Sequence, residues 1–305
     1  MKARAPGKVV LSGAYSVLEG AAAIVSAVDC YVIADTSRTS DFVTEEVRAA
    51  SLSRVPWFDA SALRAQNRKL GLGSSAAILV ASLAADQLDR TSNLDDETLA
   101  DCVLPLALKA HARVQPLGSG IDVVVCCRGG TRIVQKAGDV ITQTRIQLPP
   151  TLCIEIWTAP NSCSTHDMLR TLNEYRSGHS KQYSRRIAEQ SLASQRAASA
   201  AEFGDAKSFV SALAAQRFAL EALGRDARLN IVTGEVSALA DMAAEESAAV
   251  LPAGAGGGDI AIFVGLRPPS VRLRTLMLSQ NHIAIGVSLG ARGVHGVGPE
   301  CYQAP

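Results

Sequence analysis

The stretch KLGLGSSAAILVASLAADQL, residues 69–88, begins with glycines and serines and continues as an apolar helical pattern. Gly71 and Gly73 lose much backbone entropy on folding, so a helix start containing both needs a local reason, such as a positive φ or the close approach of another group. The first turn of a helix has unpaired N–H groups and the positive end of the helix dipole, and glycines let a phosphate approach the backbone. The stretch therefore predicts a phosphate-binding helix start. An ordinary turn with a serine N-cap is the alternative for this stretch taken alone.

Length and charge limit the classes of function. The chain has 305 residues, enough for one large domain or two halves with a substantial core. Its 30 basic and 29 acidic residues nearly cancel, so no overall field attracts nucleic acid or an anionic membrane, and we expect neither as a partner. The seven cysteines are scattered without a C-x-x-C pair, which is typical of reduced thiols in the cytoplasm and not of a disulfide framework or a zinc site.

One segment, residues 9–28, carries a single charge and could be taken for a signal peptide. Gly13, Glu19 and Gly20 interrupt the apolar run, however, and the pieces on either side have the composition of buried strands. We expect two strands joined by a turn, with no signal peptide and no membrane span.

Strand and helix patterns alternate along the chain. Strand patterns are at residues 8–11, 22–28, 31–35, 123–127, 131–134, 152–158, 260–264 and 282–288. Helical patterns are at residues 75–89, 95–112 and 184–223, the last broken near residues 203–205. Residues 36–68 lack periodicity, and we expect irregular or edge structure over a site there. The order predicts a mixed α+β fold with a boundary at Pro149-Pro150, which gives an ATP-binding domain, 1–149, and a second domain, 150–305, with helices on one face of a sheet.

Three motifs rich in small residues occur along the chain: RAPGKVVLSGAYSVLEG at 4–20, KLGLGSSAA at 69–77 and PAGAGGGDIAIFV at 252–264. In order and rough spacing they resemble the GHMP kinases, a superfamily that phosphorylates small molecules, and the resemblance covers essentially the whole chain. It implies a two-lobed fold with an N-terminal ribosomal-protein-S5-like nucleotide-binding half, a C-terminal ferredoxin-like half and an active site in the cleft between them.

Within the superfamily, the motifs are similar to the phosphomevalonate kinase branch. Tyr15 lies where mevalonate kinases usually have Gly-Glu-His, and His111 lies where they have a magnesium-binding Glu. The Gly118–Asp122 element and the segment IWTAPNSCST, residues 156–165, also match this branch. Pro116, Arg128 and Leu251 depart from the Gly, aromatic residue and Lys common in related enzymes.

The resemblance also implies roles for particular residues. Asp122 would orient the acceptor and take any proton, with Lys8 beside it, and Ser75 would bind Mg²⁺. The expected ATP-binding residues are Lys69, Gly71, Leu72, Gly73, Ser74, Ser75 and Ala76. The expected acceptor-binding residues are Lys8, Tyr15, Arg113, Ser119, Gly120, Ser164, Thr165, Gly256 and Gly257.

The expected activity is the ATP- and Mg²⁺-dependent phosphorylation of (R)-5-phosphomevalonate, a small phosphorylated substrate, to 5-diphosphomevalonate in isoprenoid biosynthesis. Three alternatives on the same fold stay open: a mevalonate kinase, a diphosphomevalonate decarboxylase, and a non-catalytic metabolite sensor. The decarboxylase usually has no counterpart of Lys69, and a sensor would not need Lys8, Lys69, Ser75 and Asp122 together. The expected protein is a cytoplasmic monomer or homodimer.

Overall fold

The computed structural model of this chain describes residues 1–65, 68–138, 140–158 and 164–298. Two units are formed from separate segments of the chain. The first unit contains Met1–Val9, Ser26–Gly130 and Ser288–Pro305, and the second contains Val10–Val25 and Thr131–Val287. The predicted domain boundary at residue 149 lies within the second unit, and a division of the chain at that point stays a prediction.

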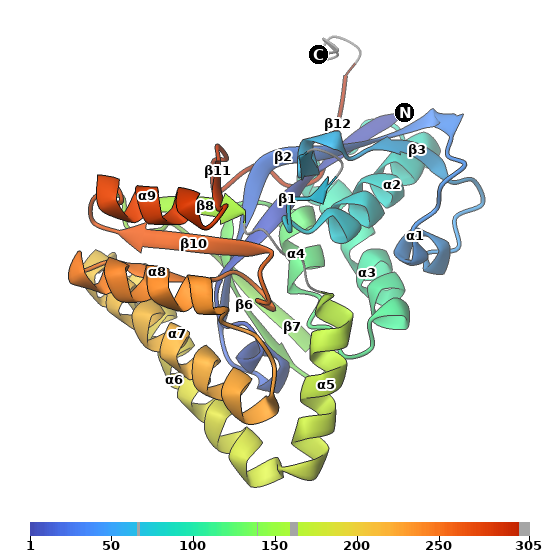
Figure 1. The fold of residues 1–305 in the computed structure, drawn as a ribbon. Coiled ribbons are helices and arrows are strands. Elements are labelled where there is room, and N and C mark those ends of the chain that lie inside the picture. Colours follow the sequence, from blue (N-terminus) through green and yellow to red (C-terminus); the bar gives the residue numbers. More distant parts are fainter. Residues whose placement is uncertain (66–67, 139, 159–163, 299–305) are drawn as a thin grey trace. The chain divides into compact units, whose positions relative to one another are not determined.

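The first unit combines a sheet with helices (Figure 1). Its helices are α1 (Glu45–Ala49), α2 (Ser74–Arg90), α3 (Asp96–Val114) and α4 (Ile121–Arg128), with a 3-10 turn, η2 (Ser61–Leu63). Its strands are β1 (Lys2–Ser12), β2 (Ala23–Thr39), β3 (Pro56–Asp59), β4 (Arg64–Ala65), β5 (Arg68–Lys69) and β12 (His295–Gly296), of which β1 and β2 continue into the second unit. The strand order is β12-β1-β2, with β3 also paired to β2, while β4 and β5 pair separately. The predicted strands at 22–28 and 31–35 are thus one continuous strand, β2.

The two helices predicted in the first half of the chain are confirmed as α2 and α3. Every residue from Ala76 to Ala85 in α2 is buried, and the many alanines let α2 pack closely against α3 and α4. The N-cap of α3 is Asp95, whose side chain accepts a hydrogen bond from the Thr98 N–H at 2.8 Å. This capping bond explains why α3 begins where it does.

The strand predicted at residues 123–127 is wrong, because these residues form the short helix α4. Gly120 precedes the helix with φ 75°, and Gly129 follows it with φ 62°, so glycines define both ends. Ile121 and all residues from Val123 to Cys127 are buried. A short run that is buried on every side shows neither helical nor strand periodicity, which is why the pattern misled.

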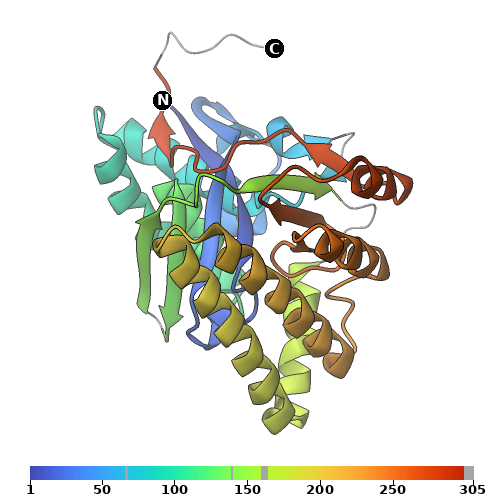
Figure 2. The ribbon, with the colours of Figure 1, turned by 90° about the vertical axis from the view of Figure 1, so that its left-hand side faces the viewer.

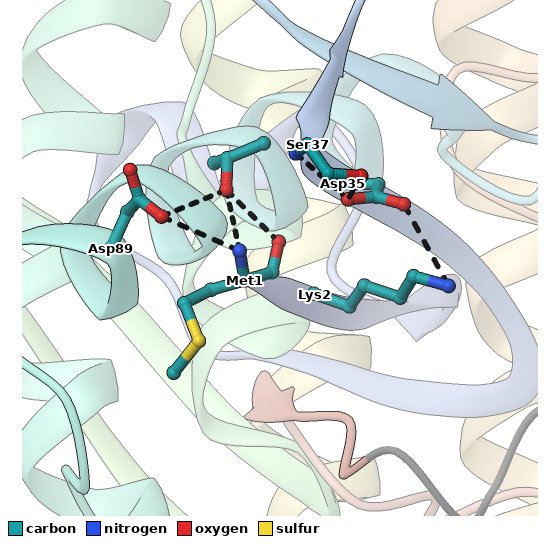
Figure 3. Close-up of polar contacts among 6 residues, drawn as sticks. Met1, Lys2, Asp35, Ser37 and Asp89 are labelled. Atoms are coloured by element: carbon teal, nitrogen blue, oxygen red, sulfur yellow. Dashed lines mark hydrogen bonds and ion pairs between the residues drawn. The ribbon is translucent and has the colours of Figure 1, made fainter.

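Polar contacts fix the beginning of β1 to β2 and to the end of α2 (Figure 3). The Met1 nitrogen donates to Thr36 Oγ1 at 2.6 Å, and this hydroxyl donates to Asp89 Oδ1 at 3.0 Å. Lys2 forms an ion pair with Asp35, 3.7 Å from Nζ to Oδ2. Three elements that are distant in sequence are therefore joined at this edge of the first unit.

The second unit contains a four-stranded antiparallel sheet with the order β11-β8-β10-β9, and a β6–β7 hairpin. Its strands are β6 (Thr131–Ala137), β7 (Val140–Ile146), β8 (Cys153–Thr158), β9 (Ala249–Pro252), β10 (Ile260–Gly265) and β11 (Ile283–Ile285). Its helices are η1 (Ser16–Glu19), α5 (Thr165–Gly178), α6 (Ser180–Glu202), α7 (Ala206–Ala227), α8 (Gly234–Glu245) and α9 (Val271–Ser279). Most predicted strands of this half are confirmed, although β11 is shorter than the predicted strand at 282–288.

Two cores stabilise the second unit. In one, α8 and α9 cover the sheet face that carries Trp157, Val250 and Phe263. In the other, residues of α5, α6 and α7, among them Leu220, pack with Tyr15. The predicted break in the long helical zone is confirmed, since α6 and α7 run side by side in both views (Figures 1 and 2). Among the described helices, none combines the length and the apolarity needed to cross a bilayer.

The turn after β1 depends on Gly13. Its φ is 84°, and a Cβ there would lie 2.4 Å from the Ala22 carbonyl oxygen and 2.5 Å from the Ala23 Cα. Just before it, the buried Ser12 hydroxyl donates to Gln216 Oε1 at 2.6 Å and so joins this turn to α7. The motif SGAYSVLEG therefore has both a steric and a polar constraint.

We expect Gly13→Ala to lower the free energy of unfolding by more than about 2 kcal/mol, because it adds a backbone clash to the cost of a positive φ. The matched control is Gly204→Ala, at φ 70° with open space around the added Cβ, which we expect to cost only about 1 kcal/mol. Urea unfolding of both variants measures the difference. Equal losses would show that the contact with residues 22 and 23 does not constrain the turn.

Candidate functional site

β1 and the loop before α2 lie in direct backbone contact. The Lys8 N–H donates to the Leu72 carbonyl oxygen at 2.8 Å. A Cβ at Gly7 would lie 2.8 Å from that same oxygen, so a side chain would push the two segments apart. This contact aligns the first motif with the second.

The start of α2 has an unusual cap. Gly73 is the N-cap residue, with φ 77°, and it offers no side-chain hydrogen bond to the first turn. The aliphatic part of the Lys8 side chain lies over it, since a Cβ on Gly73 would be 2.7 Å from Lys8 Cε. Ser74 and Ser75 follow, both partly exposed. A helix start with a positive dipole end, no capping side chain and a neighbouring lysine can bind an anion such as a phosphate.

Asp122 lies in the first turn of α4, where its Oδ1 accepts a hydrogen bond from the Val123 N–H at 3.0 Å. One turn later, Cys126 is fully buried. Burial first, and then the charges of Asp122 and Cys127, raise the pKa of the Cys126 thiol well above its ordinary value, while the charge of Lys8 lowers it. Lys8 and Asp122 are therefore both close enough to act electrostatically on one buried thiol.

The loop before α4 is tightly folded around Gly118. The Gly118 N–H donates to the Gln115 carbonyl oxygen at 2.9 Å, and a Cβ on Gly118 would lie 2.8 Å from Nε2 of the buried His111. In the described residues that Nε2 atom has no hydrogen-bond partner. Ser119 is partly exposed and Gly120 is buried, so this loop presents one hydroxyl directly ahead of Asp122.

Arg113 and Lys69 have different surroundings. The Arg113 guanidinium is exposed and donates to the Ala49 carbonyl oxygen at the end of α1, 2.9 Å away. Lys69 is exposed at the end of β5. Both positive charges belong to the first unit, and their roles toward ATP and acceptor stay predictions.

In the second unit, Tyr15 and the glycine-rich motif meet. Tyr15 has φ 62°, rare for a residue with a side chain, and its buried hydroxyl donates to the Ala255 carbonyl oxygen at 2.5 Å. Gly256 lies against the Ile231 backbone so closely that a Cβ would be 2.2 Å from its oxygen, and the Gly257 N–H donates to that oxygen at 3.0 Å. The structure thus brings Tyr15 and Gly256-Gly257 into one neighbourhood of this unit.

Ser164 and Thr165 begin α5. The Ser164 hydroxyl accepts a hydrogen bond from the Asp167 N–H at 3.3 Å and is the N-cap of the helix, while Thr165 is exposed. A capping serine explains the local structure without a ligand. Binding of an acceptor by these two residues stays a prediction.

One carboxylate near the predicted site escaped the sequence analysis. Glu46, in α1, is buried. Its Oε1 lies 3.5 Å from the side-chain nitrogen of Gln115, which begins the loop before α4. The available signal was Thr44, which caps α1 by accepting a hydrogen bond from the Val47 N–H. That signal predicts a helix start but gives no indication of what the helix packs against.

The buried cysteines of α4 give a test of this geometry. We expect iodoacetamide to alkylate the half-exposed Cys102 and Cys153 in the native protein and to leave Cys126 and Cys127 unmodified, because the thiolate is the reactive form and burial raises both pKa values. Mass spectrometry of peptides from native and denatured protein measures this. Equal native labelling of Cys126 and Cys102 would contradict the burial of α4.

Two kinases of known activity are similar to this chain in sequence. No family model matches the sequence. The chain is 28% identical over 223 residues to the phosphomevalonate kinase of Streptomyces sp. (strain CL190), a match covering 66% of this chain and 59% of that enzyme. It is 29% identical over 150 residues to the mevalonate kinase of Archaeoglobus fulgidus, covering 43% and 51% of the two chains. The matched parts therefore span only about half to three fifths of these relatives.

The fold is similar to that of solved kinases. The Streptococcus pneumoniae phosphomevalonate kinase, in complex with phosphomevalonate and AMPPNP, superposes with a TM-score of 0.77 at 15% identity, over 95% of this chain and 99% of that one. The mixed α+β fold predicted from the order of the strand and helix patterns is confirmed. This chain has the fold of the GHMP kinases, and its sequence is similar to that of a phosphomevalonate kinase.

Proposed function

We propose that this chain is an ATP- and Mg²⁺-dependent kinase that transfers a phosphoryl group to the phosphate of (R)-5-phosphomevalonate. The observation that carries the proposal is the position of Lys8, whose aliphatic part lies over the glycine start of α2. Phosphoryl transfer depends mainly on positioning and on neutralising charge, and this arrangement supplies both. The 28% identity to a phosphomevalonate kinase supports the choice of acceptor.

The residues at the start of α2 fit a nucleotide phosphate. Gly71 and Gly73 have positive φ angles, and without a capping side chain the first N–H groups can point at phosphate oxygens. Lys69 would add positive charge near the terminal phosphates. This proposal assigns Gly71 to Ala76 to the triphosphate.

The partly exposed Ser75 hydroxyl fits Mg²⁺, a hard cation that prefers oxygen ligands. Among the described residues no three His, Cys, Asp or Glu side chains are grouped as a metal site, which agrees with a cation that takes most of its ligands from phosphates and water. When bound, Mg²⁺ would neutralise phosphate charge and align the transferred group.

Asp122 and Lys8 would act on the acceptor. A phosphate monoester has a second pKa near about 6 and is largely a dianion at neutral pH, so little proton abstraction is needed. Asp122 would orient the acceptor and take any proton that remains on it, and Lys8 would reduce the repulsion between two dianions. Ser119 and the Gly120 N–H would add hydrogen bonds at the same loop.

Further contacts to the acceptor are part of this proposal. Arg113 now donates to a backbone carbonyl, a weaker partner than a phosphate dianion, so an exchange of partners on binding would be favourable. Tyr15, Ser164, Thr165, Gly256 and Gly257 are further residues that we propose to bind the acceptor. We propose a cytoplasmic enzyme acting on this small molecule as a monomer or homodimer.

A mevalonate kinase is the second candidate, because the Archaeoglobus mevalonate kinase also matches in sequence. Such an enzyme phosphorylates a hydroxyl group, which requires Asp122 to serve as a true general base. His111 in place of the magnesium-binding Glu favours the phosphate acceptor.

ADP release with ATP and Mg²⁺ distinguishes the candidates. We expect turnover with 5-phosphomevalonate and none with mevalonate or 5-diphosphomevalonate, because the two alternative acceptors need a different base or a decarboxylation step. Evolution of CO₂ from the third substrate is followed in parallel. Turnover with mevalonate alone would show that mevalonate, and not 5-phosphomevalonate, is the acceptor. No turnover with any of the three compounds would favour a non-catalytic metabolite sensor.

Two isosteric substitutions test the catalytic assignment. We expect Asp122→Asn and Lys8→Met each to lower kcat at least ~100-fold, the scale for a positioned acceptor or charge-stabilising group. The controls are Asp41→Asn and Lys181→Met, which change the same charges at exposed positions. Wild-type kcat in either site variant would remove that residue from the proposed mechanism.

A further inference from the structure

The C-terminal strap, residues 288–298, binds the end of α4 by its backbone. The Val294 N–H donates to the Cys127 carbonyl oxygen at 3.0 Å, and the Gly130 N–H donates to the Ala291 carbonyl oxygen at 2.8 Å. Gly293 lies against α4 so closely that a Cβ would be 2.3 Å from the Cys127 oxygen. Because α4 has only eight residues, contacts at its last turn matter for the whole helix.

The strap is itself attached to the sheet and to α3. The Gly290 N–H lies 2.9 Å from the Ala27 carbonyl oxygen and 3.0 Å from the Ser26 hydroxyl, both in β2. Arg292 Nε donates to Asp96 Oδ2 in α3 at 2.5 Å. At its far end, β12 pairs with Ala3 and Arg4 of β1.

His295 of β12 has a hydrogen-bond pattern that requires a neutral ring. Its Nδ1 lies 2.7 Å from the Gly293 carbonyl oxygen, which can only accept, so Nδ1 must carry the hydrogen. Arg4 Nε donates to His295 Nε2 at 2.5 Å, so Nε2 must offer its lone pair. A second proton on the ring would place two N–H groups against each other and break the contact between β12 and β1.

The groups around His295 oppose its protonation. The residue is 2% exposed, and its ring makes an edge-on contact with Tyr31 of β2, with centroids 5.7 Å apart. Burial lowers the pKa of His295; the nearby Gly293 carbonyl and Asp96 raise it, and the positive charges of Arg292 and Arg4 lower it further. Tyr31 donates to the Arg292 carbonyl oxygen at 3.1 Å, and burial raises its pKa, so it stays neutral.

We propose that the strap is a clamp that positions α4, and with it Asp122, and that protonation of His295 opens this clamp. The catalytic consequence rests on the proposed function, whereas the clamp itself does not. His295, Arg4 and Gly293 are positioning residues in this scheme, since they act on Asp122 through the backbone of α4. An opened strap binds the proton more readily than a closed one, so the open form gains as the pH falls below about 6.5.

Hydrogen exchange by mass spectrometry on the full chain tests the clamp. Protection factors, corrected for the intrinsic pH effect, are compared between peptides from residues 121–130 and peptides from α2 in the same unit. Between about pH 7.5 and pH 5.5 we expect the protection factors of 121–130 to fall ~10-fold more than those of α2. His282, in the second unit, is also buried and has a lowered pKa, so its protonation would lower the stability of the whole protein. The α2 reference separates such a general loss of protection from a loss confined to α4.

Three variants make the test specific. His295→Gln keeps a donor and an acceptor but cannot be protonated, so we expect protection of 121–130 to become independent of pH. We expect Gly293→Ala to lose this protection at both pH values, while Gly298→Ala, with open space around the added Cβ, behaves as the wild type. Equal pH effects on α2 and α4 in the wild type, or an unchanged pH effect in His295→Gln, would overturn the proposal.

Activity measurements separate the clamp from the proposed function. If the chain is a kinase, we expect kcat to fall with the protection of 121–130 as the pH is lowered, while the KM for ATP stays constant. In His295→Gln we expect kcat to lose this decrease at low pH. A kcat that is unaffected when 121–130 loses protection would overturn the link to Asp122. A pH-dependent clamp in a protein without kinase activity would support the clamp and reject the proposed function.

Discussion

The first unit depends on how closely β1 approaches the loop before α2. The Lys8 N–H binds the Leu72 carbonyl oxygen at 2.8 Å, and neither Gly7 nor Gly73 could carry a side chain without displacing its neighbour. Backbone geometry therefore places Lys8 over the first turn of α2, and the side chain does not need a specific partner to hold it there. Because the same contact brings the first and second motifs together, the electrostatics of the candidate site begin with it.

Close backbone approach recurs at other glycines of both units. A Cβ would lie 2.4 Å from a carbonyl oxygen at Gly13, 2.2 Å at Gly256 and 2.3 Å at Gly293. The first two belong to motifs that the sequence analysis singled out, and the third does not. A cluster of glycines predicts that backbone approaches backbone, yet no periodicity indicates which segment approaches. The motifs could therefore be found from the sequence, while their packing partners had to come from the structure.

The same distinction explains which predictions succeeded. The long helices α2, α3, α6 and α7 repeat apolar residues over many turns, and such patterns are reliable. In the short helix α4, residues 123–127 are all buried, and the pattern of these residues predicts a strand. For the candidate site, Lys8, Asp122 and the glycine loop could be named from motifs, but their roles depend on ligands that sequence patterns do not place. His295 lies outside every motif, and its partner Arg4 is 291 residues away, so no local signal could reveal it.

Cys126, one turn after Asp122 in α4, is fully buried, and this burial has a consequence for the proposed chemistry. A thiolate at that position would place a third charge beside those of Lys8 and Asp122 and would neutralise Lys8 before any phosphate arrived. Burial raises the pKa of the thiol, with Asp122 adding to the effect, so Cys126 stays neutral and the charge of Lys8 remains available for the phosphates. Since α4 supplies both Asp122 and this neutral thiol, a clamp that fixes its end would control the position and the electrostatic environment of the site together.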